Sequence, residues 1–203
     1  MMYLPNSVLS IDFETTGLIP NYDYPTSFSA VVFDEGEPTG DVFTRKIVPG
    51  DKAKISLEAL MVQGLDLKSE GFRDRLTETI KDLFPDNAVT AKECMEDFAK
   101  WSTGSGYNLL PNVAHMASFD WPFFEQKLAI NRSVHLGNAL SPIWICTKAL
   151  ACHLWPDKAA KNLDSVLLAL GLPKRDSMGH DSLEDAVKCG QAYFGLKKLL
   201  EAK

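Results

Sequence analysis

Four acidic residues and one histidine are the side chains of this sequence whose types and spacing could support chemistry. Asp12 and Glu14 lie near the start, Asp120 lies in the middle, and His180 and Asp185 lie near the end. Grouped carboxylates bind hard divalent cations such as Mg²⁺ or Mn²⁺, and a histidine titrates near neutral pH. If folding brought them together, these groups would suit a metal-dependent reaction with a histidine as general base.

The first pair, Asp12 and Glu14, closes a segment that alternates as a β-strand does. Side chains along a strand point alternately to opposite faces, so both carboxylates point the same way. One face would carry Leu9, Ile11 and Phe13, and the other Val8, Ser10, Asp12 and Glu14. A divalent cation would turn the repulsion between the carboxylates into an advantage, but for a bare pair an exposed acidic strand end is the common alternative.

Asp120 follows an apolar segment, residues 112–115, that we expect to be a buried strand, and it precedes a helix expected over 121–129 with Pro122 in its first turn. An aspartate at such a place is equally expected to cap the helix through a backbone N–H bond, and Ser118 competes for that cap. The position alone therefore leaves a metal ligand and a helix cap equally open.

The third group lies around His180. Asp181 and Glu184 have the spacing of a capping box, so we expect the last helix to begin at Asp181. Inside one helix His180 and Asp185 would lie about 140° apart, at roughly 100° per residue. Because His180 stands just outside, its side chain can turn toward Asp185, although a lone Gly-His pair more often just flanks a helix start.

These groups need elements that bring them to one place. We expect strands over 7–13, 26–33 and 41–48, with turn formers at 34–40, and further strands over 112–115 and 143–146. Helices are expected over 55–64 with Ser56 as cap, 71–83, 91–101, 121–129, 148–154, 163–170 and 181–200. An antiparallel β start followed by α/β alternation predicts a mixed sheet covered by helices.

Length and composition favour one globular domain that does not enter a membrane. The chain has 203 residues, 45% of them apolar, and no apolar run long enough to cross a bilayer or serve as an export signal. We expect a soluble, cytoplasmic protein. The 21 basic and 27 acidic residues give a net charge of −6, which argues against long-range duplex binding but not against a grip on a few terminal nucleotides.

The four cysteines, Cys94, Cys146, Cys152 and Cys189, are far apart and lie among helix-like residues. This spacing favours reduced, mostly buried thiols over a disulfide framework. Cys146, Cys152 and His153 are close enough to raise a zinc site, but they lack the paired spacing of structural zinc ligands. Core packing is the preferred interpretation.

Three segments together carry a family resemblance. SIDFETTG, AHMASFDWPFF and GHDSLEDA resemble the three motifs of the DEDDh exonucleases, the DnaQ-like branch of the ribonuclease H-like superfamily. The resemblance implies one domain over residues 1–203, built on a five-stranded mixed α/β sheet of three antiparallel and then parallel strands, with helices on both faces. A stretch near 68–89 looks longer than in compact members, and we expect it to be an extra helical segment that shapes substrate access or a partner surface.

The resemblance also implies an activity. Asp12, Glu14, Asp120 and Asp185 would hold two divalent metal ions, Mg²⁺ or Mn²⁺, and His180 would activate the attacking water. The reaction would be 3′-to-5′ hydrolysis of single-stranded nucleic acid, with DNA slightly preferred over RNA and nucleoside 5′-monophosphates as products. Similar enzymes are often dimers, so a homodimer is a further expectation.

By the same resemblance the terminal nucleotide would lie against Thr15, Thr16, Gly17, Leu18, His115 and Phe119. A simple turn remains open for 15–18, as does core packing for Phe119. Two positions depart from the family: Met116 stands where asparagine is frequent, and Cys146 where aspartate is frequent.

Two other functions are weighed against this one. A non-catalytic nucleic-acid or protein-interaction module could share the fold, although all five catalytic positions are filled. A glycoside hydrolase needs two acids and no histidine after a third motif.

Overall fold

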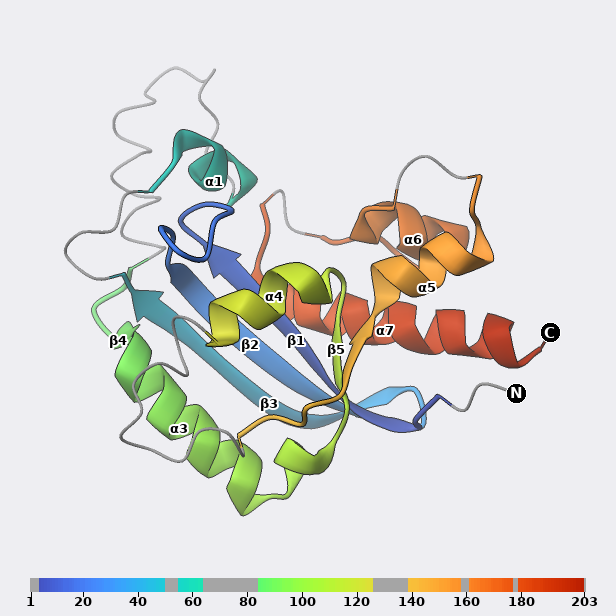
Figure 1. Ribbon diagram of the computed structural model, residues 1–203, viewed down its shortest axis with the longest axis horizontal. Coiled ribbons are helices and arrows are strands. Elements are labelled where there is room, and N and C mark those ends of the chain that lie inside the picture. Colours follow the sequence, from blue (N-terminus) through green and yellow to red (C-terminus); the bar gives the residue numbers. More distant parts are fainter. Residues whose placement is uncertain are drawn as a thin grey trace.

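A six-stranded mixed sheet forms the centre of the part of the chain that the structure describes (Figure 1). The structure is a computed structural model, and the described residues are 4–49, 55–63, 84–125, 139–157, 161–176 and 179–202. The strand order is β4-β3-β2-β1-β5-β6. The strands are β1 (Ser7–Thr15), β2 (Pro25–Asp34), β3 (Glu37–Val48), β4 (Val89–Thr90), β5 (Asn112–Ala114) and β6 (Trp144–Cys146).

Helices cover both faces of this sheet. The apolar side chains of α3 pack on one face, those of α7 pack on the other, and α5 and α6 pack against α7. The helices are α1 (Leu57–Val62), α3 (Ala91–Gly104), the 3₁₀ helix η1 (Tyr107–Leu109), α4 (Ala117–Phe123), α5 (Thr147–Leu154), α6 (Leu163–Ala169) and α7 (Ser182–Glu201). The expected mixed sheet with helices on both faces is confirmed.

The alternation along β1 divides its side chains between these two layers. Leu9, Ile11 and Phe13 are buried in the core against α3, whereas Val8 is buried in the core against α7. On the α7 side, the hydroxyl of Ser10 donates to the carbonyl oxygen of Ala186 in α7 at 2.7 Å. The two faces expected from the sequence are therefore the observed ones, and the polar face looks toward α7.

The hairpin between β2 and β3 is tighter than expected. Glu35 and Gly36 both have positive φ, 49° and 99°, which is the backbone of a two-residue type I′ turn. Pairing resumes at once, with Asp34 opposite Glu37. The strand expected over 41–48 therefore begins at Glu37, because a primed turn lets the turn-forming residues after it join the ladder.

The sheet has one strand more than the five expected. β4 lies parallel to the end of β3, with Val89 opposite Ile47 and Thr90 opposite Val48. Two residues are too few to show alternation, so the sequence pattern carried no signal for it. Thr90 also caps α3 in a capping box with Glu93, which joins the strand directly to the helix.

Helix α4 corrects the boundary expected for the segment after β5. It begins at Ala117 instead of 121, its N-cap is Met116, and no side chain makes the cap hydrogen bond. Neither Ser118 nor Asp120 caps it, and Pro122 lies inside the helix rather than in its first turn. The end of the helix expected over 121–129 lies outside the described residues, as do the helix expected over 71–83 and most of the stretch 68–89.

Most other expected helices are confirmed with small shifts at their ends. Ser56 caps α1 as expected, accepting from the backbone N–H of Ala59 at 3.0 Å. Asp181 caps α7, which begins at Ser182. Asn162 caps α6, a cap that the sequence pattern did not single out. No described helix has the length and apolarity needed to cross a membrane.

The cysteines are less buried than expected. All four are free; Cys94 and Cys189 are buried, Cys146 is half-buried and Cys152 is exposed. Burial raises the pKa of the Cys94 thiol to about 12, which leaves it inert as a nucleophile near neutral pH.

Close contact between α7 and the sheet depends on Gly190. A Cβ at this position would overlap the ring of Phe33 on β2, so only glycine lets the helix approach so closely. Polar contacts support the same interface, since the hydroxyls of Ser29 on β2 and Ser182 on α7 lie 2.9 Å apart in the buried layer. The first turn of α7 is thereby fixed on the sheet.

Gly190→Ala should destabilise the protein by about 1 to 3 kcal/mol, because overpacking forces the helix or the ring to move. Urea denaturation would measure the loss. Gly104→Ala is the matched control: Gly104 ends α3 with nothing within 4 Å of a built Cβ, so its substitution should be neutral or stabilising. Equal effects of the two substitutions would contradict the role given to Gly190.

Candidate active site

The carboxyl end of β1 extends beyond its parallel neighbour. The pairing of β1 with β5 covers Leu9 opposite Asn112 and Ser10 opposite Val113, so Asp12 and Glu14 lie past the paired region. Parallel strands end at the same edge of a sheet, and residues that follow them gather there. The chain after β5 enters α4 at this edge, which brings Asp120 toward the two acids of β1.

Electrostatic coupling shows that four carboxylates converge at this edge. The pKa of Asp12 is raised well above its usual value, first by burial and then by the charges of Asp120, Glu14 and Asp185, while the positive charge of Arg175 acts in the opposite direction. Residues from β1, α4 and α7 therefore share one site, as the three motifs predicted.

Asp120 is 3% exposed. Burial raises the pKa of its carboxyl to about 8, the negative charge of Asp185 adds to this, and a hydrogen bond from the backbone N–H of Phe13 lowers it. The carboxylate thus reaches the backbone of β1 where β5 no longer pairs with it. The helix-cap alternative is excluded for Asp120, because no side chain makes the cap hydrogen bond of α4.

Glu14 has a buried carboxylate oxygen without a hydrogen-bond partner. Burial raises the pKa of its carboxyl to about 8, the nearby imidazole of His180 lowers it, and the charge of Asp185 raises it. Its Oε1 atom is buried without a hydrogen-bond partner. Buried polar atoms are nearly always paired, so an orphan carboxylate oxygen beside other acids marks a place for a cation.

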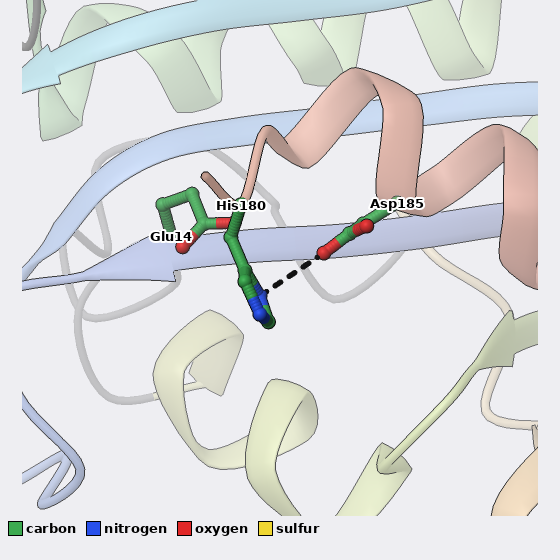
Figure 2. A group of neighbouring side chains, drawn as sticks. All are labelled: Glu14, His180 and Asp185. Carbon is green, nitrogen blue, oxygen red and sulfur yellow. Dashed lines mark ion pairs between the residues drawn. The ribbon is translucent and has the colours of Figure 1, made fainter. Parts of the chain in front are cut away.

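Glu14, His180 and Asp185 form a compact group of potential metal ligands. One ligand atom from each lies within 4.8 Å of the others, and Figure 2 shows the three side chains gathered at the end of β1. His180 Nδ1 lies 3.2 Å from Asp185 Oδ2. The donor set fits a divalent cation, since carboxylate oxygens and imidazole nitrogens are common ligands of such ions.

Within the described ranges this is the only such group of three or more histidine, cysteine or acidic residues. The zinc alternative at Cys146, Cys152 and His153 is therefore not supported; the Cys146 thiol instead lies 3.5 Å from the carbonyl oxygen of His115.

The backbone around His180 is held on both sides. Its N–H donates to the carbonyl oxygen of Val62 at the end of α1, at 2.9 Å. On the other side, the Asp181 carboxylate accepts from the N–H groups of Leu183 and Glu184. The expected N-cap is confirmed, and the Glu184 carboxylate accepts from the N–H of Asp176. His180 lies outside α7 and faces Asp185, as the sequence analysis anticipated.

The segment 15–18 uses most of its polar groups to fold itself. The Thr15 hydroxyl donates to the carbonyl oxygen of Gly17 at 2.6 Å, and the Thr16 hydroxyl accepts from the N–H of Tyr24 at 3.0 Å. Leu18, in contrast, is 79% exposed. The two hydroxyls thus support a turn, and Leu18 is the side chain of this segment that is free to contact a ligand.

Gly17 is required for a reason that the sequence did not suggest. A Cβ at Gly17 would lie 2.5 Å from the carboxylate of Asp23, which accepts from the N–H of Ile19 at 2.8 Å. Asp23 thereby closes the loop between β1 and β2 on itself. Sequence reasoning missed Asp23, because no motif spacing connects it to the turn.

His115 and Phe119, also expected at the substrate, have partners within the protein. One ring nitrogen of His115 lies 2.9 Å from the Thr147 hydroxyl and the other 2.8 Å from the carbonyl oxygen of Lys161. Phe119 is half-buried and packs on Phe123, with ring centroids 4.9 Å apart. Both arrangements favour a supporting role near the site.

Met116, one of the two departures from the family pattern, also has a defined neighbour. Met116 is 38% exposed, and its sulfur lies 3.5 Å from the ammonium of Lys148. Lys148 follows Thr147, whose hydroxyl lies beside the ring of His115.

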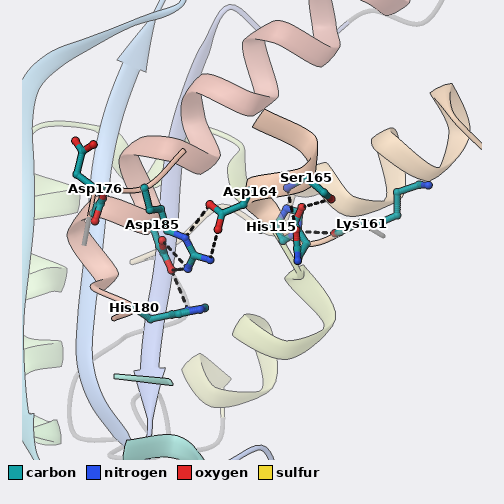
Figure 3. Close-up of polar contacts among 10 residues, drawn as sticks. His115, Lys161, Asp164, Ser165, Asp176, His180 and Asp185 are labelled. Atoms are coloured by element: carbon teal, nitrogen blue, oxygen red, sulfur yellow. Dashed lines mark hydrogen bonds and ion pairs between the residues drawn. The ribbon is translucent and has the colours of Figure 1, made fainter. Parts of the chain in front are cut away.

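Sequence reasoning also missed a guanidinium inside the site. Arg175 donates to both oxygens of Asp185, at 3.3 and 3.0 Å, and makes two bonds of 3.0 Å to Asp164 of α6. Figure 3 shows Asp164, Asp185 and His180 along this line of contacts. Arg175 lies in the segment before the third motif, where no periodicity singles it out.

Comparisons with known proteins agree with this geometry. A family model described as an exonuclease, RNase_T, matches residues 9–193, which include all three motifs. No curated protein matches the chain.

Several solved structures share the fold. The nuclease domain of 3′hExo, a DEDDh family member bound to rAMP, has a TM-score of 0.69 at 15% identity over 97% of this chain and 92% of that chain. Exonuclease X with 5′ overhanging duplex DNA has a TM-score of 0.61 at 20% identity over 95% and 92%. The E. coli ExoI–ssDNA complex has 0.68 at 14% identity, over 98% of this chain and 42% of that one. These likenesses identify the sheet as ribonuclease H-like.

The metal-free protein should lose stability as pH rises. Glu14 and Asp120 bind their protons more tightly in the folded chain, where each pKa is about 8, than at the ordinary values of 4.5 and 3.8. Their contribution is fully present below the ordinary values and is lost as pH rises through about 8. Melting temperatures in EDTA should therefore fall from about pH 5.5 to about pH 8.5.

The double variant Glu14→Gln, Asp120→Asn should flatten this pH dependence, and Mn²⁺ should raise the melting temperature of the unaltered protein most at high pH. An unchanged slope in the double variant would show that the acids of the site are not its source.

Proposed function

The chain belongs to the RNase_T exonuclease family, and we propose that it hydrolyses the terminal phosphodiester at the 3′ end of single-stranded nucleic acid. The products are nucleoside 5′-monophosphates. The observation that carries this proposal is the convergence of four carboxylates with a histidine at the carboxyl end of β1, in a chain whose family is an exonuclease family.

The carboxylates are suited to hold cations rather than protons. Raised pKa values mean that these carboxyls resist being ionised together at neutral pH unless a cation neutralises them. Asp12, Glu14, Asp120 and Asp185 would hold two divalent cations, Mg²⁺ or Mn²⁺, which neutralise phosphate charge and lower the pKa of water when bound. Net charge −6 does not oppose this role, because the positive charge is then supplied at the site itself.

His180 is placed to take a proton. In the tautomer whose Nδ1–H donates to Asp185, Nε2 carries the free lone pair of a general base. The side chain is 42% exposed, so water reaches it. Asp185 orients the ring and stabilises the imidazolium after proton transfer, as carboxylates do for catalytic histidines.

The substrate strand would approach along the loop between β1 and β2. Leu18 at 79% exposure offers an apolar surface for a terminal base, and Thr15, Thr16 and Gly17 fix the loop beneath it. Single strands suit the site because the 3′ end must enter a buried group of acids. Among the structural neighbours, ExoI is bound to ssDNA, 3′hExo to rAMP and Exonuclease X to a duplex with a 5′ overhang. We propose that DNA is slightly preferred over RNA as the substrate.

The first experiment compares 5′-labelled single-stranded DNA and RNA of one sequence with Mg²⁺, Mn²⁺ or EDTA. A ladder that shortens from the 3′ end only with metal supports the proposal, and the faster ladder ranks the substrates. If the purified protein binds these strands without cutting either, it is a non-catalytic binding module. A homodimer and a cytoplasmic location stay predictions from the sequence.

Asp12→Ala should abolish metal-dependent cleavage, since Asp12 interacts with all three other acids. The fold should be retained or stabilised because the substitution also removes repulsion. Asp157→Ala, at an exposed position after α5, is the control and should cleave normally. Residual cleavage by Asp12→Ala near the normal rate would exclude this residue as a metal ligand.

His180→Ala should reduce the rate by roughly 10²-fold to 10⁴-fold at saturating metal if His180 is the general base, with metal binding largely retained. His180→Gln keeps a polar side chain without a titrating group, and it should be impaired as strongly. Unchanged turnover in both variants would remove His180 from the mechanism.

A further inference from the structure

Arg175 joins two acidic residues that come from different helices. Its Nε and Nη2 atoms donate to the two oxygens of Asp164, each at 3.0 Å. Its Nη1 atom donates to both oxygens of Asp185, at 3.3 and 3.0 Å. The planar guanidinium thus binds Asp164 through its Nε–Nη2 edge and Asp185 through Nη1. This geometry fixes the orientation of both carboxylates.

This contact is screened from water on the Asp185 side. The side chain of Arg175 is 13% exposed and that of Asp185 is 5% exposed, against 30% for Asp164. A buried ion pair is favourable only when its hydrogen-bond geometry is good, and loss of one partner leaves the other charge buried without a counter-charge. Surface pairs elsewhere, such as Arg45 with Asp97, are far more exposed.

Asp164 is itself fixed by local structure. It lies in the first turn of α6, whose N-cap Asn162 accepts from the N–H of Ser165 at 2.8 Å. The hydrogen bonds from Arg175 lower the pKa of Asp164, so it stays charged. The contact therefore runs from a capped helix, through Arg175, to the first turn of α7.

We propose that Asp164 and Arg175 are positioning residues that orient the Asp185 carboxylate toward Glu14 and His180, so that Asp185 can bind a divalent cation. Neither residue touches the substrate. The inference rests on the proposed function, in which Asp185 is a metal ligand. It assigns a role to α6, which lies outside the three motifs of the site.

The sign of the effect separates positioning from simple charge. An arginine that acted only through its positive charge would repel a nearby cation, and removing it would tighten metal binding. A positioning arginine has the opposite effect, because its loss frees the carboxylate to turn away. Partners of metal ligands of this kind typically change metal affinity or activity by about 10-fold to 100-fold.

The experiment measures the Mn²⁺ dissociation constant of the full chain, without nucleic acid, by calorimetry or by the electron paramagnetic resonance signal of free Mn²⁺. Arg175→Gln should weaken Mn²⁺ binding by about 10-fold to 100-fold. Asp164→Asn keeps the arginine charge but removes its anchor, and it should weaken binding in the same direction. The double variant should be no worse than Arg175→Gln alone, because the two residues act through one contact.

Asp97→Asn is the matched control, since it breaks another arginine–aspartate pair away from the site, and it should bind Mn²⁺ normally. Arg175→Lys keeps the positive charge but lacks the planar set of N–H donors. Its Mn²⁺ binding should therefore lie between that of the unaltered chain and that of Arg175→Gln. Thermal melts identify any variant that fails to fold; Asp164→Asn, with the most exposed of the three side chains, then carries the test.

Tighter or unchanged Mn²⁺ binding in folded Arg175→Gln and Asp164→Asn would overturn the inference, whether or not the protein cleaves nucleic acid. Mn²⁺ binding that weakens in both variants, in a protein that cuts no strand, would uphold the positioning role and refute the exonuclease proposal instead. Absence of Mn²⁺ binding by the unaltered chain would overturn both.

Discussion

Repulsion among the carboxylates gathered at the carboxyl end of β1 is the constraint on which the rest of the structure depends. Burial raises the pKa of Asp12, Glu14 and Asp120 the most, and the negative charge of Asp185 raises each of them further. A fold selected only for stability would avoid such a group, because buried charges need partners. The surrounding elements must therefore hold the acids in place against this repulsion.

The tertiary structure meets that constraint from several sides. α7 lies close to the sheet because Gly190 has no side chain to separate it from Phe33. The hydroxyls of Ser29 and Ser182 meet beneath its first turn, and Ser29 stands opposite Asp12 in the sheet. The first turn of α7, which carries Asp185, is thereby fixed to the strand that pairs with the first acid. Among the ion-pair contacts found in the described residues, Asp185 has two partners, the guanidinium of Arg175 and the ring of His180.

Where sequence and structure differ, the difference has a local cause. The sequence predicts a later start for α4 than the observed one, because the N-cap Met116 makes no side-chain cap hydrogen bond and gives no sign of a helix start. The sequence does not predict β4, because two residues show no periodicity. In the segment 15–18, which the resemblance places against the terminal nucleotide, the threonine hydroxyls bond within the loop. His115 likewise has partners for both ring nitrogens, and contact of these positions with the nucleotide stays a prediction.

The sequence by itself determined the two faces of β1, the cap of α7 and the three motifs that name the acids, because alternation, capping and motif spacing are local properties of the chain. It could not place Asp164 beside Arg175 or Asp23 beneath Gly17, since these contacts join segments that no repeating pattern relates. Only the tertiary structure decided that Asp120 is a buried acid bound to the backbone of β1 and not a helix cap. The reason is physical: a carboxylate has the same local preferences in either role, and only the strand end and helices packed around it determine which role it takes.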